Sequence, residues 1–345
     1  MDEVAFLREL LEIYSPSGRE GELAACLKGH MEALGFRVRV DEVGNVIGVL
    51  GPSSGEEVLL LGHMDTVEGF IPVRLQDGRL YGRGAVDAKG SLAAFVLAAA
   101  RAALALRDRR LIVIGAVEEE AHGRGARHLV PRFRPRYAVV GEPSGWEGIA
   151  LGYKGRLVVR YRLSWPVRHT ATPEPSAAEE ALRFWDRLSR YARRVNRGRE
   201  RSFERLGVSL RSINTSGDGF EERVEMVIVL RTPPGMDVEG LRERVSRWAD
   251  GAELRFAGGE AAFKAGKNNP LVRAFLRAIR AQGGRPRFKL KTGTSDMNVV
   301  GPAWGCPIVA YGPGDSALDH TPNEYIEIEE YLRAIEVLAQ VLGEL

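Results

Sequence analysis

The stretch that decides the fold is Val58–Val67, which reads Val-Leu-Leu-Leu-Gly-His-Met-Asp-Thr-Val. Its four leading apolar residues predict a strand that is buried on both faces, as in a parallel sheet. Gly62 ends the apolar run, and His63 and Asp65 follow it. Ligands of open α/β sheets bind beyond the carboxyl ends of strands, so the imidazole could bind a metal while the carboxylate orients the ring. An ordinary polar loop after a core strand is the alternative.

Length and composition limit the class of protein. A chain of 345 residues is long enough for two domains, and 44% apolar with 28% charged residues is typical of a soluble globular protein. The longest apolar run, Leu92–Ala100, is too short to cross a bilayer, and the first twelve residues contain no signal-peptide core. We therefore expect a cytoplasmic protein that does not enter a membrane.

The cysteines and the charges exclude further classes. Two cysteines, Cys26 and Cys306, give no disulfide framework and predict no thiolate metal site. The formal net charge is +3, but residues 154–264 carry 22 basic and 16 acidic side chains. Because the basic run lacks interleaved aromatic residues, it does not indicate nucleic-acid binding.

Other polar side chains follow predicted strands or turns as His63 does. They lie in Glu118-Glu119-Glu120 after the strand Leu111–Ala116, in Gly141-Glu142-Pro143 after Tyr137–Val140, in the turn 82–90 at Asp87, and in Leu318–Pro322 at His320. Two imidazoles and three carboxylates form a set of N and O ligands that suits Zn²⁺ or another first-row divalent ion. One carboxylate can bridge two such ions about 3.5–4 Å apart.

The pattern changes near Lys154 and predicts an inserted domain. The order of elements is strand, helix, strand, strand, helix, strand, which is a split βαβ unit. These elements are predicted at 157–163, 175–195, 207–213, 223–231, 237–249 and 252–256. We therefore expect a discontinuous main α/β domain, 1–153 plus 267–345, with 154–266 inserted as an α+β domain.

Taken together, these motifs resemble a known family. His63-Met64-Asp65, Gly82-Arg83-Gly84 with Asp87, Glu119-Glu120, Gly141-Glu142-Pro143 and His320 are similar to the M20 family of two-zinc aminoacylases and carboxypeptidases. The resemblance covers essentially the whole chain. It implies a mixed-sheet, di-zinc aminopeptidase-like catalytic domain with a ferredoxin-like lid domain through which two subunits form a homodimer.

The resemblance also implies a role for each matching residue. His63, Asp87 and Glu142 would hold one Zn²⁺, with Co²⁺ as a substitute, and Asp87 would bridge to a second ion held by Glu120 and His320. Glu119 would be the general base, and Asp65 would support His63. Glu118–Glu119 remains an alternative pair, although the spacing to Gly125 favours Glu119–Glu120. His169 matches the lid histidine that the partner subunit supplies in the family to donate to the oxyanion; a surface histidine at a helix entrance is the alternative.

Several residues are candidates for substrate binding. Arg231 matches the family arginine that binds a substrate carboxylate, a geometry suited to a bidentate guanidinium. A Gly/Thr-containing loop could present N–H groups and hydroxyls to an amino-acid substrate, and Asp296 and Glu324 could bind a cationic side chain. The loop candidates are Thr292, Gly293, Thr294, Ser295, Asp296 and Asn298.

The late loops resemble one branch of the family in particular. That branch releases lysine or ornithine from the C-terminal γ-glutamyl group of an acidic amino-group carrier protein, in lysine and arginine biosynthesis. N-acetylornithine or N-acetyl-lysine deacetylase, succinyl-diaminopimelate desuccinylase and peptidase activities are alternatives with the same metal centre. A catalytically inactive binding protein on the same scaffold is an alternative of another class.

The run Arg183–Arg205, with nine arginines against three acids, is either a solvated helix face or a docking surface for the acidic carrier.

Overall fold

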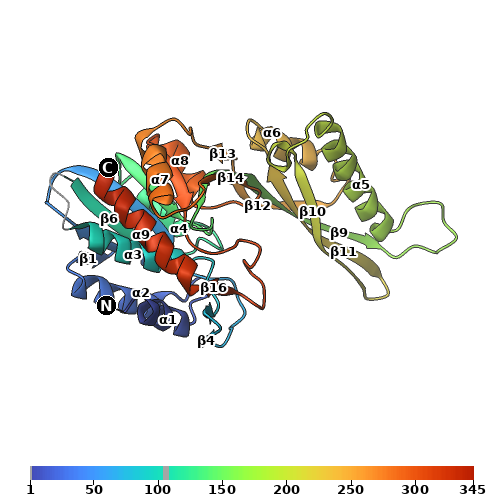
Figure 1. The fold of residues 1–345 in the computed structure, drawn as a ribbon. Helices are drawn as coiled ribbons and strands as arrows, with labels where there is room; N and C mark the ends of the chain where they lie inside the picture. The colour runs from blue at the N-terminus through green and yellow to red at the C-terminus, as the bar shows by residue number, and fades with distance from the viewer. Residues whose placement is uncertain (1, 104–108) are drawn as a thin grey trace. The chain divides into compact units, whose positions relative to one another are not determined.

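The computed structural model describes residues 2–103 and 109–345, which divide into two compact units (Figure 1). The first unit comprises the chain up to Gly152, Ala265–Leu290 and Ser295–Leu345. The second comprises Tyr153–Lys264 together with Lys291–Thr294. The predicted inserted domain, 154–266, does not include Lys291–Thr294, which the structure assigns to the second unit. The sequence did not indicate this, because the segment is distant in the chain from the inserted strands.

The first unit is built on a mixed sheet with the strand order β1-β2-β6-β3-β7-β15-β8, and β14 also pairs with β8. Its strands are β1 (Arg37–Val40), β2 (Val46–Leu50), β3 (Glu56–His63), β6 (Arg109–Ala116), β7 (Tyr137–Gly141), β8 (Gly148–Tyr153), β14 (Arg287–Lys291) and β15 (Ile308–Tyr311). A small second sheet contains β4 (Arg74–Gln76), β5 (Arg79–Tyr81) and β16 (Tyr325–Glu327).

The four central strands β6, β3, β7 and β15 run parallel to one another. Their carboxyl ends therefore lie at one edge of the sheet. As the sequence predicts, the central residues of β3 are fully buried, with Leu59, Leu60 and Leu61 at 0% exposure. The strand ends supply His63 directly, the Glu118–Glu120 turn after β6, Glu142 after β7, and the loop to His320 after β15.

Helices cover this sheet. α3 packs on α9 within the main apolar core, which also includes side chains of α1, α2 and α7, whereas α4 and α8 contact each other elsewhere. The helices are α1 (Glu3–Glu12), α2 (Gly21–Ala33), α3 (Lys89–Ala102), α4 (Arg124–Leu129), α7 (Pro270–Ala281), α8 (Met297–Trp304) and α9 (Ile328–Glu344). The end of the helix predicted for Ser91–Leu106 lies outside the described residues. No helix in the described ranges is long and apolar enough to cross a bilayer.

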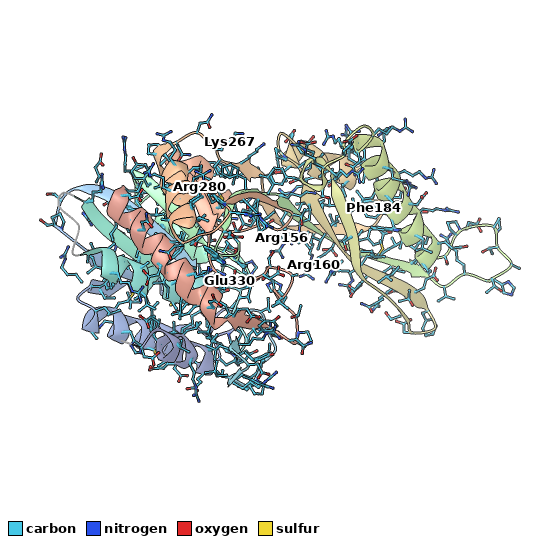
Figure 2. The ribbon with its side chains drawn as sticks, viewed as in Figure 1. Arg156, Arg160, Phe184, Lys267, Arg280 and Glu330 are labelled. Atoms are coloured by element: carbon cyan, nitrogen blue, oxygen red, sulfur yellow. The ribbon has the colours of Figure 1, made fainter. Side chains whose placement is uncertain are left out.

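The second unit has the predicted order of elements. They are β9 (Gly155–Pro166), α5 (Ala177–Val195), a 3-10 turn (Ser202–Glu204), β10 (Gly207–Gly217), β11 (Glu221–Thr232), α6 (Val238–Ser246) and β12 (Glu253–Glu260), followed by short β13 (Phe263–Lys264). The four long strands form an antiparallel sheet with the order β10-β11-β9-β12. Phe184 of α5 packs on Tyr161 of β9, with ring centroids 4.8 Å apart, so the helices cover one face of this sheet (Figure 2).

Candidate active site

His63 is oriented by its own strand end. The ring is 2% exposed, and its Nδ1 lies 2.9 Å from the Asp65 backbone carbonyl oxygen. A ring N–H that donates to this carbonyl leaves Nε2 available for a metal. The Asp65 carboxylate has a second task, because it accepts the backbone N–H groups of Glu119 and Glu120 at 3.0 Å each. It also accepts the Ser17 hydroxyl at 2.7 Å, a contact that sequence reasoning missed.

Asp87 lies between two imidazoles. Its Oδ1 is 3.2 Å from His63 Nε2, and its Oδ2 is 3.1 Å from His320 Nε2. His320 Nε2 is in turn 2.7 Å from Glu120 Oε1. Ligand atoms of Asp87, Glu120 and His320 all lie within 4.8 Å of one another. The two carboxylate oxygens of Asp87 thus point toward two separate sets of side chains, as a bridging ligand requires.

The three adjacent glutamates point in different directions. The Glu118 carboxylate bonds Arg124 at 2.9 Å, whereas Glu120 contacts His320. Glu118 has a φ of 57°, and this left-handed residue separates β6 from the two acids that follow. The turn also needs Gly125, since a Cβ there would lie 2.6 Å from the Val117 nitrogen. The geometry therefore favours Glu119–Glu120 over Glu118–Glu119.

The site concentrates negative charge in a buried position. Burial, followed by the charge of Glu142, raises the pKa of Glu119 well above its usual range. Burial and the charge of Asp87 likewise raise the pKa of Glu142. Hydrogen bonds with Asp87 and Glu120 raise the pKa of His320 to about 10. The raised pKa values show that Glu119 and Glu142 are costly to ionise without a compensating cation. Asp87 is the exception, because its contacts with the two imidazoles lower its pKa.

The residues fit a pair of divalent metal ions. Two imidazoles and three carboxylates supply only N and O donors, and Asp87 offers one oxygen to each side. The excess of buried carboxylates is what two cations would neutralise. Glu119 makes no hydrogen bond to an imidazole among the described contacts, which leaves its carboxylate available as a base.

Glu324 does not bind substrate as the sequence suggested. Its side chain is fully buried, and it accepts from Arg83 at 2.7 Å and from the backbone N–H groups of Gly84, Val86 and Asp87 at 2.9–3.1 Å. Both oxygens are therefore used to hold the turn that presents Asp87. The Gly82-Arg83-Gly84 motif contained the signal for this pair, but spacing alone could not show that an acid 241 residues later completes it.

The loop 291–298 is divided between the two units, Thr292–Thr294 in the second and Ser295 onward in the first. Ser295 N–H donates to Asn298 Oδ1 at 3.0 Å, so this pair shapes the start of α8. Thr292 is exposed, and Gly293 and Thr294 are partly buried. Asp296 is buried, and its charge contributes to raising the pKa values of both Glu119 and Glu142, which places it beside the acids.

Two candidate residues belong to the second unit. His169 is exposed in the turn after β9, where its Nδ1 accepts the Ala171 N–H at 3.2 Å. That bond favours the tautomer with a proton on Nε2, so the ring presents a donor to solvent. Arg231, near the end of β11, donates through Nη1 to Thr294 Oγ1 at 2.6 Å.

The first unit has a cavity of about 510 Å³ beside Glu120. Tyr14, Ser17 and Thr66 are among the residues that line it.

The fold and the cluster define a class, that of metal-dependent hydrolases with the centre at the carboxyl edge of a mixed sheet. Residues 59–344 match peptidase family M20/M25/M40, and the chain belongs to this family.

Relatives with more specific names cover the whole chain. A LysW-lysine hydrolase of Deinococcus radiodurans is 46% identical over 98% of this chain and 96% of its own length. A provisionally named LysW-lysine/LysW-ornithine hydrolase of Thermococcus kodakarensis is 43% identical over 100% and 92%. The crystal structure of an M20 family metallo-carboxypeptidase from Sulfolobus solfataricus has the same fold, with a TM-score of 0.83, 18% identity and coverage of 100% and 99%. The chain is thus an amide hydrolase, and the alternative of an inactive binding protein is not supported.

Proposed function

We propose that this protein hydrolyses the amide bond that joins lysine, and secondarily ornithine, to the C-terminal γ-glutamyl group of an acidic carrier protein. The convergence of His63, Asp87, Glu120 and His320 carries the chemical part of this proposal. The substrate part is supported by the relatives named as LysW-lysine hydrolases. Such a reaction would belong to lysine and arginine biosynthesis in the cytoplasm.

Two divalent ions are the proposed cofactors, Zn²⁺ or Co²⁺ in its place. His63, Asp87 and Glu142 would hold one ion, and Asp87, Glu120 and His320 the other. Bound ions would supply Lewis acidity at the amide carbonyl and lower the pKa of the attacking water.

Glu119 is the proposed acid–base residue. Its carboxylate would take a proton from the attacking water and deliver it to the departing α-amino group of lysine. Asp65 positions the backbone that carries this side chain, because its carboxylate accepts the Glu119 N–H at 3.0 Å. Ser17 in turn holds Asp65, so a hydroxyl from a separate loop supports the base indirectly.

Residues of the second unit complete the proposal. His169 would donate Nε2–H to the developing oxyanion. Arg231, whose Nη1 donates to Thr294 Oγ1, would bind the carboxylate of the lysine that is released, because a guanidinium can pair with a carboxylate in a bidentate manner. Asp296 would attract the cationic side chain of the substrate from the first unit.

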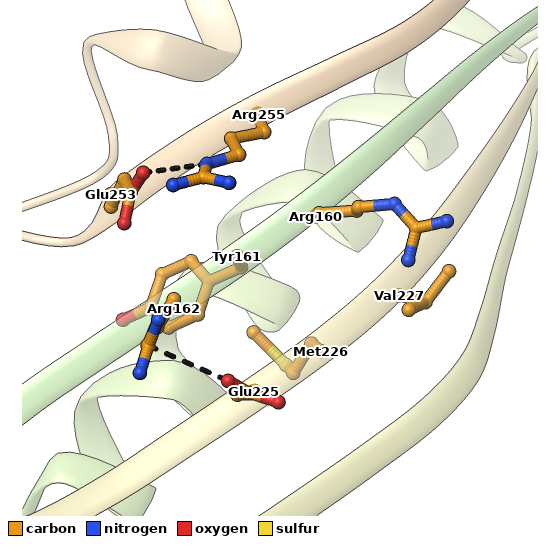
Figure 3. Close-up of a pocket in the computed structure, with 8 residues that line it drawn as sticks. All are labelled: Arg160, Tyr161, Arg162, Glu225, Met226, Val227, Glu253 and Arg255. Atoms are coloured by element: carbon orange, nitrogen blue, oxygen red, sulfur yellow. Dashed lines mark hydrogen bonds and ion pairs between the residues drawn. The ribbon is translucent and has the colours of Figure 1, made fainter.

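The open face of the second unit's sheet is the proposed docking surface for the carrier. Side chains alternate along a strand, and the register pairs Arg231 with Arg156 and Val227 with Arg160. Arg156, Arg160 and Arg231 therefore share the face opposite the helices. In the groove of Figure 3, Arg255 lies across from Arg160, and both side chains are exposed. A basic path thus leads from the groove to the arginine proposed to bind substrate.

The arginines of α5 are less suited to this role. Arg187 pairs with Glu180 and Asp250, and Arg190 pairs with Asp186, so acids of the same unit already neutralise these two arginines. In the groove, Arg162 and Arg255 also have acidic neighbours, but Arg160 has no ion-pair partner within the described part of the chain. We infer that an acidic carrier docks on the sheet face rather than on α5.

Homodimerisation through the second unit is part of the proposal. Among the strands that the structure describes, β10 is an edge strand paired with β11 alone, and most of its residues are exposed. An exposed edge can pair with the same edge of a second copy.

Activity on four substrates tests the proposed function. We expect carrier-linked lysine to be hydrolysed with the highest kcat/KM, ahead of acetyl-lysine, acetylornithine and succinyl-diaminopimelate. A higher kcat/KM for acetylornithine or for succinyl-diaminopimelate would contradict the proposal and indicate the corresponding deacylase activity.

A further inference from the structure

A second cluster of metal-ligating side chains lies on α1 and α2, apart from the catalytic residues. Glu9 Oε1 is 3.6 Å from Cys26 Sγ, and Glu9 Oε2 is 3.0 Å from His30 Nε2. Ligand atoms of the three residues all lie within 4.8 Å of one another. Within the described ranges, this is the one such group that includes sulfur.

The local structure directs these side chains toward a common point. Cys26 and His30 are four residues apart on α2 and therefore lie on the same helix face. The His30 ring packs on Phe6 of α1, with centroids 4.8 Å apart, and this contact orients Nε2 toward Glu9. Each oxygen of Glu9 faces one of the two other ligands. The arrangement is thus formed by the packing of two helices and not by a single flexible loop.

The separations are close to those between ligands of one ion. Typical Zn–S, Zn–N and Zn–O bonds, combined with a tetrahedral angle, place two ligand atoms about 3.4–3.6 Å apart. Sulfur lies 3.6 Å from one oxygen of Glu9, and the imidazole nitrogen lies 3.0 Å from the other oxygen, so binding through a single Glu9 oxygen requires a shift of the side chains. Glu9 is exposed, so a water molecule can complete the coordination as a fourth ligand.

We propose that Glu9, Cys26 and His30 form an additional binding site for a borderline-soft divalent cation such as Zn²⁺ or Co²⁺. The sequence did not predict this site, because its third ligand, Glu9, lies on a different helix from Cys26 and His30. An ion here would join α1 to α2. The buried Lys89 ammonium, at the start of α3, donates to the Leu10 and Ile13 carbonyl oxygens at the end of α1, at 3.0 and 2.6 Å. An ion that stabilises α1 would therefore also support the start of α3.

Binding at this site should depend on pH. A cysteine binds a metal ion as the thiolate, so the ion must displace the thiol proton, and its affinity should increase as pH rises.

Optical titration of the full chain with Co²⁺ tests the proposal. A thiolate ligand gives a sulfur-to-cobalt charge-transfer band in the near ultraviolet, and the catalytic residues contain no sulfur. After treatment with a chelator, wild-type protein and the control Cys306→Ser should both develop this band. Cys26→Ser should lack it while still binding two Co²⁺ ions. His30→Ala should need at least about tenfold more Co²⁺, as loss of a ligand weakens a site by this order or more.

The contrary results are equally specific. Absence of the band in the wild-type protein would overturn the proposal, as would a band that is lost in Cys306→Ser but kept in Cys26→Ser. An unchanged Co²⁺ affinity in His30→Ala would show that Cys26 binds the ion without His30, and this would also overturn the proposal. The charge-transfer band and its loss in Cys26→Ser do not depend on hydrolysis, so they test this site separately from the proposed function.

Discussion

At the scale of the residue, the position of Asp87 determines what the site can do. Its two oxygens face His63 and His320, and its backbone N–H is held by Glu324. The strand end at His63 and the glycine-flanked turn at Asp87 indicated part of this arrangement, and the resemblance to the M20 family implied that His320 joins it. The sequence did not predict the buried support, since Ser17 and Glu324 have no distinctive spacing.

Replacing Glu119 by Gln tests the proposed base. The amide cannot accept a proton from water, so kcat should fall by about 10²- to 10⁴-fold. Metal content should stay at two ions per chain, because Glu119 is not a proposed ligand. Steady-state kinetics with metal analysis checks this. The isosteric change Glu118→Gln is the control and should retain nearly full activity, as that side chain pairs with Arg124. A fully active Glu119→Gln variant would contradict the assignment.

Glu324 should be important for stability. Glu324→Gln leaves Arg83 as an uncompensated buried charge, and breaking such a pair costs about 3–5 kcal/mol of unfolding free energy. Denaturant unfolding measures the loss. Glu327→Gln removes an exposed pair with Arg79 and should cost no more than about 1 kcal/mol. Equal effects of the two changes would show that Glu324 does not hold the Asp87 turn.

At the scale of the element, strand order accounts for most of what could be predicted. Buried apolar runs indicated β3, β6 and β7, and parallel neighbours bring their carboxyl ends together. Pairing between strands distant in sequence, such as β15 with β7, could not be read from periodicity. The second unit was easier, because its strands alternate and its helices are amphipathic. The role of its outer face depends on register, which the sequence alone does not give.

Charge reversal on the sheet face tests the docking surface. Arg160→Glu combined with Arg255→Glu should raise KM for carrier-linked lysine by about tenfold or more at low salt, because complementary charges steer association. KM for acetyl-lysine should not change. The matched control is the same reversal at Arg190 and Arg193 of α5, where we expect a smaller effect. Equal increases for both substrates, or a larger effect of the α5 variant, would reject the sheet face as the docking surface.

The stability of the second unit should depend on pH through Lys154. Burial, together with the charge of Arg231, lowers the pKa of Lys154 to about 8. The unfolded chain therefore binds more protons than the folded chain between about pH 8 and pH 10.5, and unfolding free energy should increase as pH rises through this range. Denaturant unfolding at several pH values, compared with Lys154→Met, isolates this contribution. A Lys154→Met variant with the same pH dependence as the wild-type protein would contradict it.

At the scale of the whole molecule, activity should require the metal ions. Removal with a chelator should abolish hydrolysis, and addition of Zn²⁺ or Co²⁺ should restore it, because neither Glu119 nor His169 alone can polarise the amide carbonyl. Calcium is a suitable control, since it prefers more oxygen ligands than this centre offers. Hydrolysis that persists after complete removal of metal would contradict the proposed chemistry.

The central claim is that side chains separated by more than 250 residues in the chain bind two ions on Asp87. Anomalous diffraction from crystals grown with Zn²⁺ measures this directly. We predict two peaks about 3.5–4 Å apart at this centre, one beside His63 and Glu142 and the other beside Glu120 and His320. A single peak, or two peaks that do not share Asp87, would contradict this claim.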